Sequence, residues 1–145
     1  MRILVLGNSN IFNRKVFPAL KKFKNLKIEI ASRRKLVHVS KVDKCFSSYS
    51  KALKNTKAKL IYISLINSQH YKWARKSLEY NKHIIVDKPL TLKLKQTLKL
   101  ILLAKKKKLF LSEAIVFHYH KQFTEILSKV DFKSKTKINT YFHIP

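Results

Sequence analysis

The residues best suited to chemistry are Asp87, Lys88 and Pro89, which directly follow the short apolar run 83–86. An ammonium group at the end of a buried strand can act as a general acid or orient a carbonyl group, particularly when it is partly desolvated. The same three residues could equally form a turn with a solvated ion pair. The pattern therefore makes Lys88 the first candidate for proton transfer, with Asp87 beside it.

A second candidate is the turn at Gly7, which lies between the apolar run 2–6 and a helical pattern that begins at residue 11. A glycine at such a place is typical of nucleotide-binding turns, because the start of the helix favours a pyrophosphate. The dinucleotide fingerprint asks for two further glycines, and Ser9 and Phe12 stand in their places. Ser9 is small enough for close backbone approach, and we expect Phe12 to turn inward. An ordinary turn between a strand and a helix is the alternative.

The second apolar run ends at Ser32, Arg33 and Arg34. An acidic residue here would bind the ribose 2′-hydroxyl of NAD, and none stands at the end of this run. A hydroxyl followed by arginines suits the additional 2′-phosphate of NADP. In a chain this basic, a solvated loop is the alternative.

Histidines and an amide follow two other apolar runs. Asn67 and His70 come after the run 60–65, where His70 would also fit the start of a helix. His118 and His120 stand at alternate positions, and no carboxylate or cysteine lies at a spacing that would complete a metal site. We therefore expect no bound metal.

Apolar runs of strand length alternate with stretches of helical spacing along most of the chain. Strands are predicted at residues 2–6, 26–31, 60–65, 83–86 and 109–111, and helices at 11–23, 49–54, 69–81, 92–107 and 119–130. This alternation predicts an α/β fold with a parallel, doubly wound sheet. In such a sheet ligands bind outside the carboxyl ends of the strands, where the polar residues above would meet.

Some segments carry more detailed expectations. Asn67 or Ser68 is expected to cap the helix that follows. Residues 32–48 admit a short helix and a short strand, and residues 138–144 alternate in the manner of a further strand. The longest predicted helix, 92–107, places these apolar residues on one face: Leu94, Leu98, Ile101 and Leu102.

The 145 residues include 33 basic and seven acidic ones, which gives a formal net charge of +26. Such a charge invites a nucleic-acid-binding hypothesis, because lysine and arginine neutralise phosphates. The lysines are spread over nearly every segment, however, and arginine, which base-reading proteins favour, occurs five times. No apolar stretch approaches the length of a membrane span, and the single cysteine, Cys45, fits a reducing compartment. We therefore expect a cytoplasmic protein without membrane or nucleic-acid partners.

Taken together, these segments resemble the amino-terminal half of the Gfo/Idh/MocA oxidoreductases, the family of glucose–fructose oxidoreductase and inositol dehydrogenase. The turn from Gly7 onward looks like that of sugar 3-ketoreductases and related NADP-dependent members. Two positions differ from the residues usual in this family. Asp87 replaces a glutamate, and Lys121 replaces a proline. The segments that carry the resemblance are Asn67-Ser68-Gln69-His70, Lys82-His83, Asp87-Lys88-Pro89-Leu90, Glu113-Ala114 and His120-Lys121-Gln122.

The resemblance implies a Rossmann-type domain over residues 1–122, with residues 123–145 forming a junction helix and the first strand of a truncated α+β domain. It implies hydride transfer between a nicotinamide cofactor and a hydroxyl or ketone of a sugar, sugar nucleotide or cyclitol, with NADP preferred over NAD. Lys88 would contact substrate and help to move the proton, and Lys88–Pro89 would be a cis bond. The implied cofactor-binding residues are Gly7, Asn8, Ser9, Asn10, Ile11, Ser32, Arg33, Arg34, Leu65, Asn67, His70, Asp87, Lys88 and Glu113, and the implied substrate-binding residues are Lys88, His118 and His120.

Two other hypotheses remain open from the sequence. The chain could be a non-catalytic, degenerate domain that binds a nucleotide weakly or only associates with another chain, a second copy included. It could also be a basic nucleic-acid-binding module. Under the oxidoreductase hypothesis its partners are the nicotinamide cofactor and, once a second domain is supplied, a sugar-like molecule. We expect residues 1–145 alone not to be catalytically competent.

Overall fold

The computed structural model describes residues 1–33, 41–131, 133, 134, 137, 139 and 141. The chain divides into two compact units, Met1–Ala114 and Ile115–Pro145. No helix among these described residues is long and apolar enough to cross a membrane.

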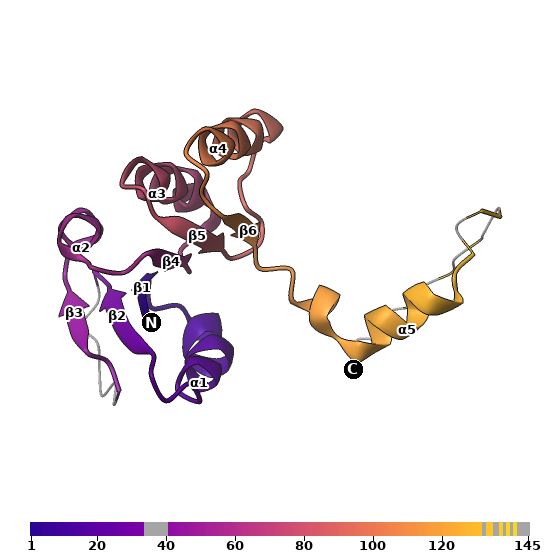
Figure 1. The fold of residues 1–145 in the computed structure, drawn as a ribbon, viewed down its shortest axis with the longest axis horizontal. Helices are drawn as coiled ribbons and strands as arrows, with labels where there is room; N and C mark the ends of the chain where they lie inside the picture. The colour runs from indigo at the N-terminus through magenta and orange to yellow at the C-terminus, as the bar shows by residue number, and fades with distance from the viewer. Residues whose placement is uncertain (34–40, 132, 135–136, 138, 140, 142–145) are drawn as a thin grey trace. The chain divides into compact units, whose positions relative to one another are not determined.

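The first unit is built on a six-stranded sheet in which every neighbouring pair of strands is parallel. The predicted doubly wound parallel sheet is therefore confirmed (Figure 1). The chain reverses its direction of winding between β1 and β4, which are the two central strands. In the spatial order β3-β2-β1-β4-β5-β6, the strands are Lys44–Phe46, Lys27–Ala31, Arg2–Leu6, Leu60–Ile63, His83–Val86 and Leu111–Glu113.

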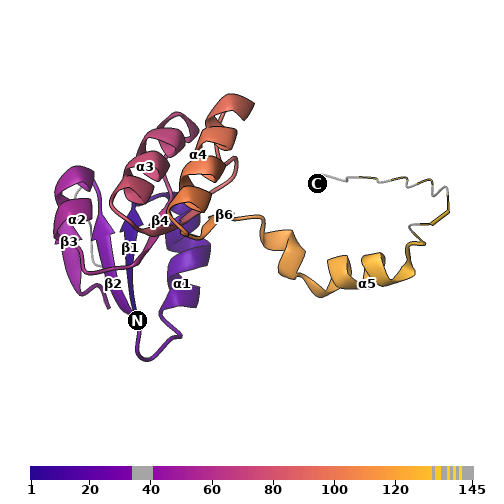
Figure 2. The same ribbon diagram turned by 45° about the horizontal axis from the view of Figure 1, so that its top comes forward.

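Helices cover both faces of the sheet. A short π-helix, η1 (Phe12–Val16), continues into α1 (Phe17–Leu20) on one face. The other face carries α2 (Tyr49–Asn55), α3 (Asn67–Glu79) and α4 (Leu94–Lys106) (Figure 1). In both views α3 and α4 lie side by side (Figure 2).

Alternating side chains of the strands form one apolar cluster on each face, as expected for strands buried on both sides. Leu4 and Leu6 of β1 pack on the side of α2, α3 and α4, whereas Ile3 and Val5 pack on the side of α1. Phe12 belongs to the second cluster and is fully buried. The prediction that it turns inward is confirmed.

The described residues of the second unit form a 3₁₀ turn, η2 (Val116–Tyr119), and the helix α5 (Lys121–Lys129). His120 caps α5, since its Nδ1 accepts a hydrogen bond from the backbone N–H of Gln122 at 3.3 Å. The ring of His118 stacks on Phe117 and meets Phe123 edge-on, each at 4.9 Å between centroids. Most of the predicted strand at residues 138–144 lies outside the described residues.

The structure corrects two details of the predicted helices. Asn67 is already the first residue of α3, and the cap position is taken by Ile66 without a side-chain hydrogen bond. In α4 the leucines expected on one face are on the exposed side, because the side that packs against α3 buries Leu100 and Ala104 instead. The segment has more leucines than one buried stripe can take, so helical spacing alone could not select the stripe. The exposed leucines are Leu94, Leu98 and Leu102.

The last strand, β6, begins two residues later than predicted. In the turn after α4, Lys108 has a left-handed conformation with a φ of 53°, and the N–H of Leu109 still bonds back to the carbonyl of Ala104. Pairing with β5 therefore starts at Leu111 rather than at Leu109. The unassigned segment 32–48 contains β3, which is only three residues long.

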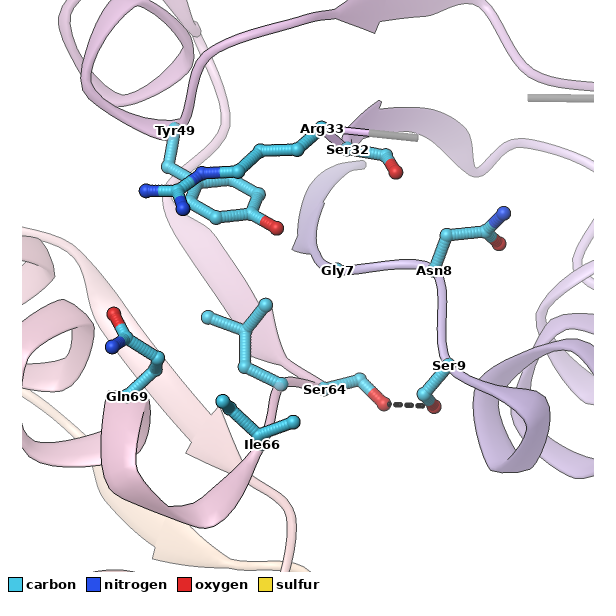
Figure 3. A pocket seen from close by; sticks show the side chains of 10 residues that line it. Gly7, Asn8, Ser9, Ser32, Arg33, Tyr49, Ser64, Ile66 and Gln69 are labelled. Carbon is cyan, nitrogen blue, oxygen red and sulfur yellow. Dashed lines mark hydrogen bonds between the residues drawn. The ribbon is translucent and has the colours of Figure 1, made fainter. Parts of the chain in front are cut away.

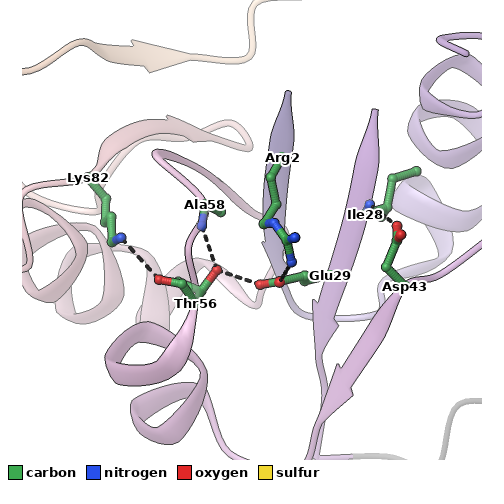
Figure 4. Close-up of polar contacts among 7 residues, drawn as sticks. All are labelled: Arg2, Ile28, Glu29, Asp43, Thr56, Ala58 and Lys82. Carbon is green, nitrogen blue, oxygen red and sulfur yellow. Dashed lines mark hydrogen bonds and ion pairs between the residues drawn. The ribbon is translucent and has the colours of Figure 1, made fainter. Parts of the chain in front are cut away.

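A partly buried ion pair and its hydrogen bonds link β1, β2 and the end of α2 (Figure 4). Glu29 of β2 is 2% exposed and accepts hydrogen bonds from Arg2 of β1 and from the hydroxyl of Thr56, which follows α2. Thr56 in turn accepts the N–H of Ala58, and its carbonyl receives the ammonium of Lys82 at 3.4 Å. Partial burial lowers the pKa of Lys82, although the charge of Glu29 opposes that change.

We predict that Glu29→Gln lowers the free energy of unfolding by about 1.5–3 kcal/mol, because it removes a charge-assisted contact and leaves Arg2 without its partner. The matched control is Glu79→Gln, which breaks the pair between Arg75 and Glu79 on the surface of α3. Those side chains are 58% and 43% exposed, so the control should lower the free energy of unfolding far less than Glu29→Gln does. Urea unfolding followed by circular dichroism measures both, and equal effects would contradict the assigned role of Glu29.

Candidate functional site

A pocket of about 380 Å³ lies at the carboxyl ends of β1, β2 and β4 (Figure 3). This edge, where the strand order reverses, is the usual ligand site of open α/β sheets. Among the described residues that line the pocket none is acidic, and Arg33 carries the only charge. The pocket is lined by Gly7, Asn8, Ser9, Ser32, Arg33, Tyr49, Ser64, Leu65, Ile66 and Gln69.

The structure brings together one part of the predicted cofactor site. The predicted residues that line the pocket are Gly7, Asn8, Ser9, Ser32, Arg33 and Leu65. Asn10 and Ile11 lie in the first turn of the helix after β1, and Arg34 lies outside the described residues. The predicted residues that do not line it are Asn67, His70, Asp87, Lys88 and Glu113.

Four lining residues were not among those predicted. Ser64, Ile66 and Gln69 belong to the turn after β4 and the first turn of α3, so the end of that apolar run was a usable signal. Tyr49 begins α2, and its ring packs against Trp73 of α3, a contact between separate segments that the sequence pattern does not indicate.

Gly7 is the point of closest approach between the turn after β1 and the end of β4. Its φ is +106°, and a Cβ at this position would lie 2.0 Å from the carbonyl oxygen of Ser64 and 2.8 Å from Cδ2 of Leu65. Any other residue would therefore suffer both backbone strain and a collision with the neighbouring strand. The first glycine of the nucleotide-binding pattern is thus required by the packing of the sheet itself.

The turn after Gly7 offers groups that fit a dinucleotide. Asn8 lines the pocket. Its side-chain oxygen is buried and has no hydrogen-bond partner among the described residues. Such an orphaned acceptor is costly unless a ligand donates to it, as a ribose hydroxyl would. The first N–H groups of the following helix, at Asn10 and Ile11, have no partner within the helix and are suited to phosphate oxygens.

A directed chain of hydrogen bonds links the turns after β1, β4 and β5. The hydroxyl of Ser64 donates to Asp87 at 2.5 Å, and the hydroxyl of Tyr62 donates to the other oxygen of the same carboxylate. The hydroxyls of Ser9 and Ser64 are 2.7 Å apart, and Ser9 accepts the N–H of Phe12. A hydroxyl has one proton, so Ser9 donates to Ser64. Asp87 therefore fixes the Gly7 turn through two serines.

The segment that carries Lys88 is held on both sides by side chains from neighbouring elements. The fully buried ring of His70 places Nδ1 2.7 Å from the carbonyl oxygen of Pro89 and Nε2 2.9 Å from that of Leu65. Glu113 at the end of β6 accepts the N–H of Leu90 at 3.0 Å. The bond between Lys88 and Pro89 is cis, as expected. His70 and Glu113 thus fix the backbone around Lys88.

Lys88 itself is exposed at this edge of the sheet. Within the described part of the chain its ammonium forms no ion pair or hydrogen bond. The backbone at Lys88 is fixed, and the N–H groups of its ammonium are not used in protein contacts. The ammonium can therefore bind a ligand without first breaking a contact within the protein. That arrangement is what proton transfer to an oxygen would need.

Tyr62 is 6% exposed, and its pKa is raised well above the ordinary value of a phenol. Burial is the largest cause, and the hydrogen bond to Asp87 and the negative charge of that carboxylate act in the same direction. The phenol therefore remains protonated in the folded protein and serves as a permanent donor to Asp87.

The two histidines with predicted substrate contacts, His118 and His120, belong to the second unit, where one stacks on aromatic rings and the other caps α5. Their predicted substrate contacts stay predictions. Across residues 1–33 and 41–131 and the few described residues beyond, no three histidine, cysteine, aspartate or glutamate residues gather in a way that could hold a metal ion.

Comparison with known proteins agrees with this geometry. Residues 1–115 match the model of an oxidoreductase family, Gfo/Idh/MocA, described as an NAD-binding Rossmann fold. A dTDP-3,4-didehydro-2,6-dideoxy-alpha-D-glucose 3-reductase of Saccharopolyspora spinosa is 28% identical over 125 residues, which are 83% of this chain and 38% of the relative. A D-xylose 1-dehydrogenase (NADP(+)) of Hypocrea jecorina is 32% identical over 76 residues, which are 52% of this chain and 19% of the relative.

Solved structures also have a similar fold. The crystal structure of a 3-ketoreductase from Actinomadura kijaniata, in complex with TDP-benzene and NADP and in an open conformation, superposes with a TM-score of 0.80 at 26% identity. The superposition covers 88% of this chain and 42% of the other. The chain thus spans about 40% of the length of the curated reductases that it matches.

We predict that Tyr62 does not ionise while the protein is folded. Because its folded-state pKa is raised, the phenol contributes stability that is fully present below about pH 10, the ordinary tyrosine value, and is lost as the pH rises further. In an alkaline titration, the folded wild type and the folded Tyr62→Phe variant should gain the same tyrosinate absorbance. In denaturant, the wild type should gain the absorbance of one more ionised tyrosine than the variant. A difference of one tyrosine in the folded state would contradict the prediction.

Proposed function

The chain belongs to the Gfo/Idh/MocA oxidoreductases, and on that premise we propose that its first unit binds a nicotinamide dinucleotide and prefers NADP to NAD. The observation that carries the preference is the end of β2, where Ser32 and Arg33 line the pocket and no acidic residue faces them among the described residues. A guanidinium suits a 2′-phosphate, whereas a carboxylate would be needed to hold the free 2′-hydroxyl of NAD. Relatives named for NADP and a neighbour solved with NADP support the same choice.

Each part of the dinucleotide has a suitable group in the pocket or in the turn beside it. Arg33 and Ser32 would bind the 2′-phosphate of the adenosine, and the N–H groups of Asn10 and Ile11 would bind the pyrophosphate. Asn8 would accept a hydrogen bond from a ribose hydroxyl, which would satisfy its buried oxygen. When bound in its reduced form, the nicotinamide supplies a hydride to a carbonyl carbon.

We propose Lys88 as the residue that moves the proton during this reaction. The hydroxyl oxygen of a sugar, sugar nucleotide or cyclitol loses a proton on oxidation, and the ketone oxygen gains one on reduction. Lys88 lies on a backbone fixed by His70 and Glu113, with its ammonium free of protein partners among the described residues. The relatives are more than twice as long as this chain, so we place the other wall of the substrate pocket outside residues 1–145.

The first prediction from the proposed function concerns cofactor preference. NADPH should bind residues 1–145 about ten- to hundredfold more tightly than NADH, because charge-assisted contacts to a phosphate contribute roughly 1.5–3 kcal/mol. Arg33→Ala should remove most of that difference while changing the NADH affinity little. Titrations followed by fluorescence of the reduced cofactor measure both constants.

Arg75→Ala is the matched control, because it removes the same charge from the surface of α3 and leaves the pocket intact. It should preserve the preference for NADPH. Equal affinities of wild type for both cofactors would contradict the proposed NADP specificity. Binding of random-sequence DNA that falls steeply with salt, without NADPH binding, would instead favour a nucleic-acid-binding module.

The second prediction concerns Lys88. In a chain that carries residues 1–145 together with a substrate domain, Lys88→Ala should lower kcat by about 10²–10⁴, which is the typical contribution of a proton-transfer group. NADPH affinity should remain within about twofold of wild type, since Lys88 does not line the pocket. A near-normal kcat in the variant would show that the segment is only a turn.

A further inference from the structure

Tyr49 lines the pocket from an element that the nucleotide-binding pattern does not include. It is the first residue of α2, behind the cap formed by Ser48, whose side chain accepts the N–H of Lys51 at 3.4 Å. The guanidinium carbon of Arg33 lies over its ring, 5.5 Å from the centroid (Figure 3). The charged group proposed to recognise the 2′-phosphate therefore rests on an aromatic face.

The ring of Tyr49 is itself held from the core. Trp73 of α3 is 3% exposed and meets the ring edge-on, with centroids 5.0 Å apart and an interplanar angle of 76°. Its indole N–H donates to the side-chain oxygen of Gln69 at 3.3 Å, and Gln69 is another residue of the pocket wall. A buried indole thus fixes two lining residues, and one of them is the support of Arg33.

This kind of support suits an arginine that must bind an anion. Arg33 is exposed and forms no ion pair within residues 1–33 and 41–131, so no carboxylate holds its long side chain in place. A carboxylate partner would also occupy the N–H groups that a phosphate needs. An aromatic face attracts the guanidinium through its π electrons and leaves the N–H groups at the edge available.

We propose that Tyr49 is a positioning residue that sets the preference for a 2′-phosphorylated dinucleotide by holding the guanidinium of Arg33 over the pocket. The proposal rests on the proposed function, because it assumes that NADP(H) occupies this site. It predicts that the aromatic ring matters and the hydroxyl does not. It also predicts that the effect of Tyr49 disappears when Arg33 is absent.

The experiment measures the dissociation constants of NADPH and NADH for wild type, Tyr49→Phe and Tyr49→Leu. Tyr49→Leu should reduce the ratio of the two constants about two- to fivefold, which corresponds to the usual strength of an exposed cation–π contact. Tyr49→Phe should retain the wild-type ratio. The NADH affinity should change little in either variant. Tyr49→Met serves as a second variant without a π face in case Tyr49→Leu does not fold, which thermal unfolding reports.

The same measurements in an Arg33→Ala background complete the test. There, Tyr49→Leu should leave the ratio unchanged, since the group that it positions is gone. If wild type prefers NADPH and Tyr49→Leu or Tyr49→Met retains the same ratio of dissociation constants, the proposal is overturned and the proposed function still stands. An equal loss of both affinities, or a Tyr49→Phe variant that behaves like Tyr49→Leu, also overturns it, because a merely structural or hydroxyl role would do this. Wild type without preference for NADPH overturns the proposed function and this inference together.

Discussion

The close approach of Gly7 to the carbonyl oxygen of Ser64 is the constraint on which the rest of the site depends. It requires a residue without a side chain, because a Cβ would lie 2.0 Å from that oxygen. Once the turn after β1 lies against the end of β4, the hydroxyls of Ser9 and Ser64 come within 2.7 Å, and Ser64 reaches Asp87. The pocket is the space left between this linked edge and the ends of β2 and α2.

Three of the seven acidic residues in this chain of net charge +26 act as structural acceptors. Glu29 is buried between Arg2 and Thr56, while Asp87 and Glu113 accept hydrogen bonds that fix the segments around Lys88. These three acids therefore lie where a buried or structural acceptor is needed. The described lining of the pocket has none, which leaves Arg33 unneutralised toward an anionic ligand. The basic composition is compatible with a specific anion site because the position of each acid matters more than the total charge.

The sequence predicted the parts of the fold that depend on local pattern. The runs at β1 and β5 are continuous, apolar and closed by turn residues, so their bounds agree with the structure. It allowed a short strand within residues 32–48 but could not place β3, whose three residues are mostly exposed. It also could not predict the buried stripe of α4, which is chosen by contact with α3. Tyr49 was missed as a pocket residue because its position depends on contact with Trp73, which is distant in sequence. The contact of His70 with the carbonyl of Pro89 joins two segments that are separate in sequence, and side-chain type alone does not specify it.

The most direct test of the account is an NADPH titration of the isotopically labelled chain followed by amide resonances in two-dimensional NMR. If NADPH binds in the pocket, the changes in amide chemical shift should concentrate at the carboxyl edge of the sheet, on Gly7, Asn8 and Arg33 and on the turn after β4. Amides at the opposite edge, including Lys57, Lys59 and Phe110, should not move. Shifts spread over the lysine-rich surface, with the Gly7 turn unaffected, would show that the chain attracts polyanions by charge and would contradict the account.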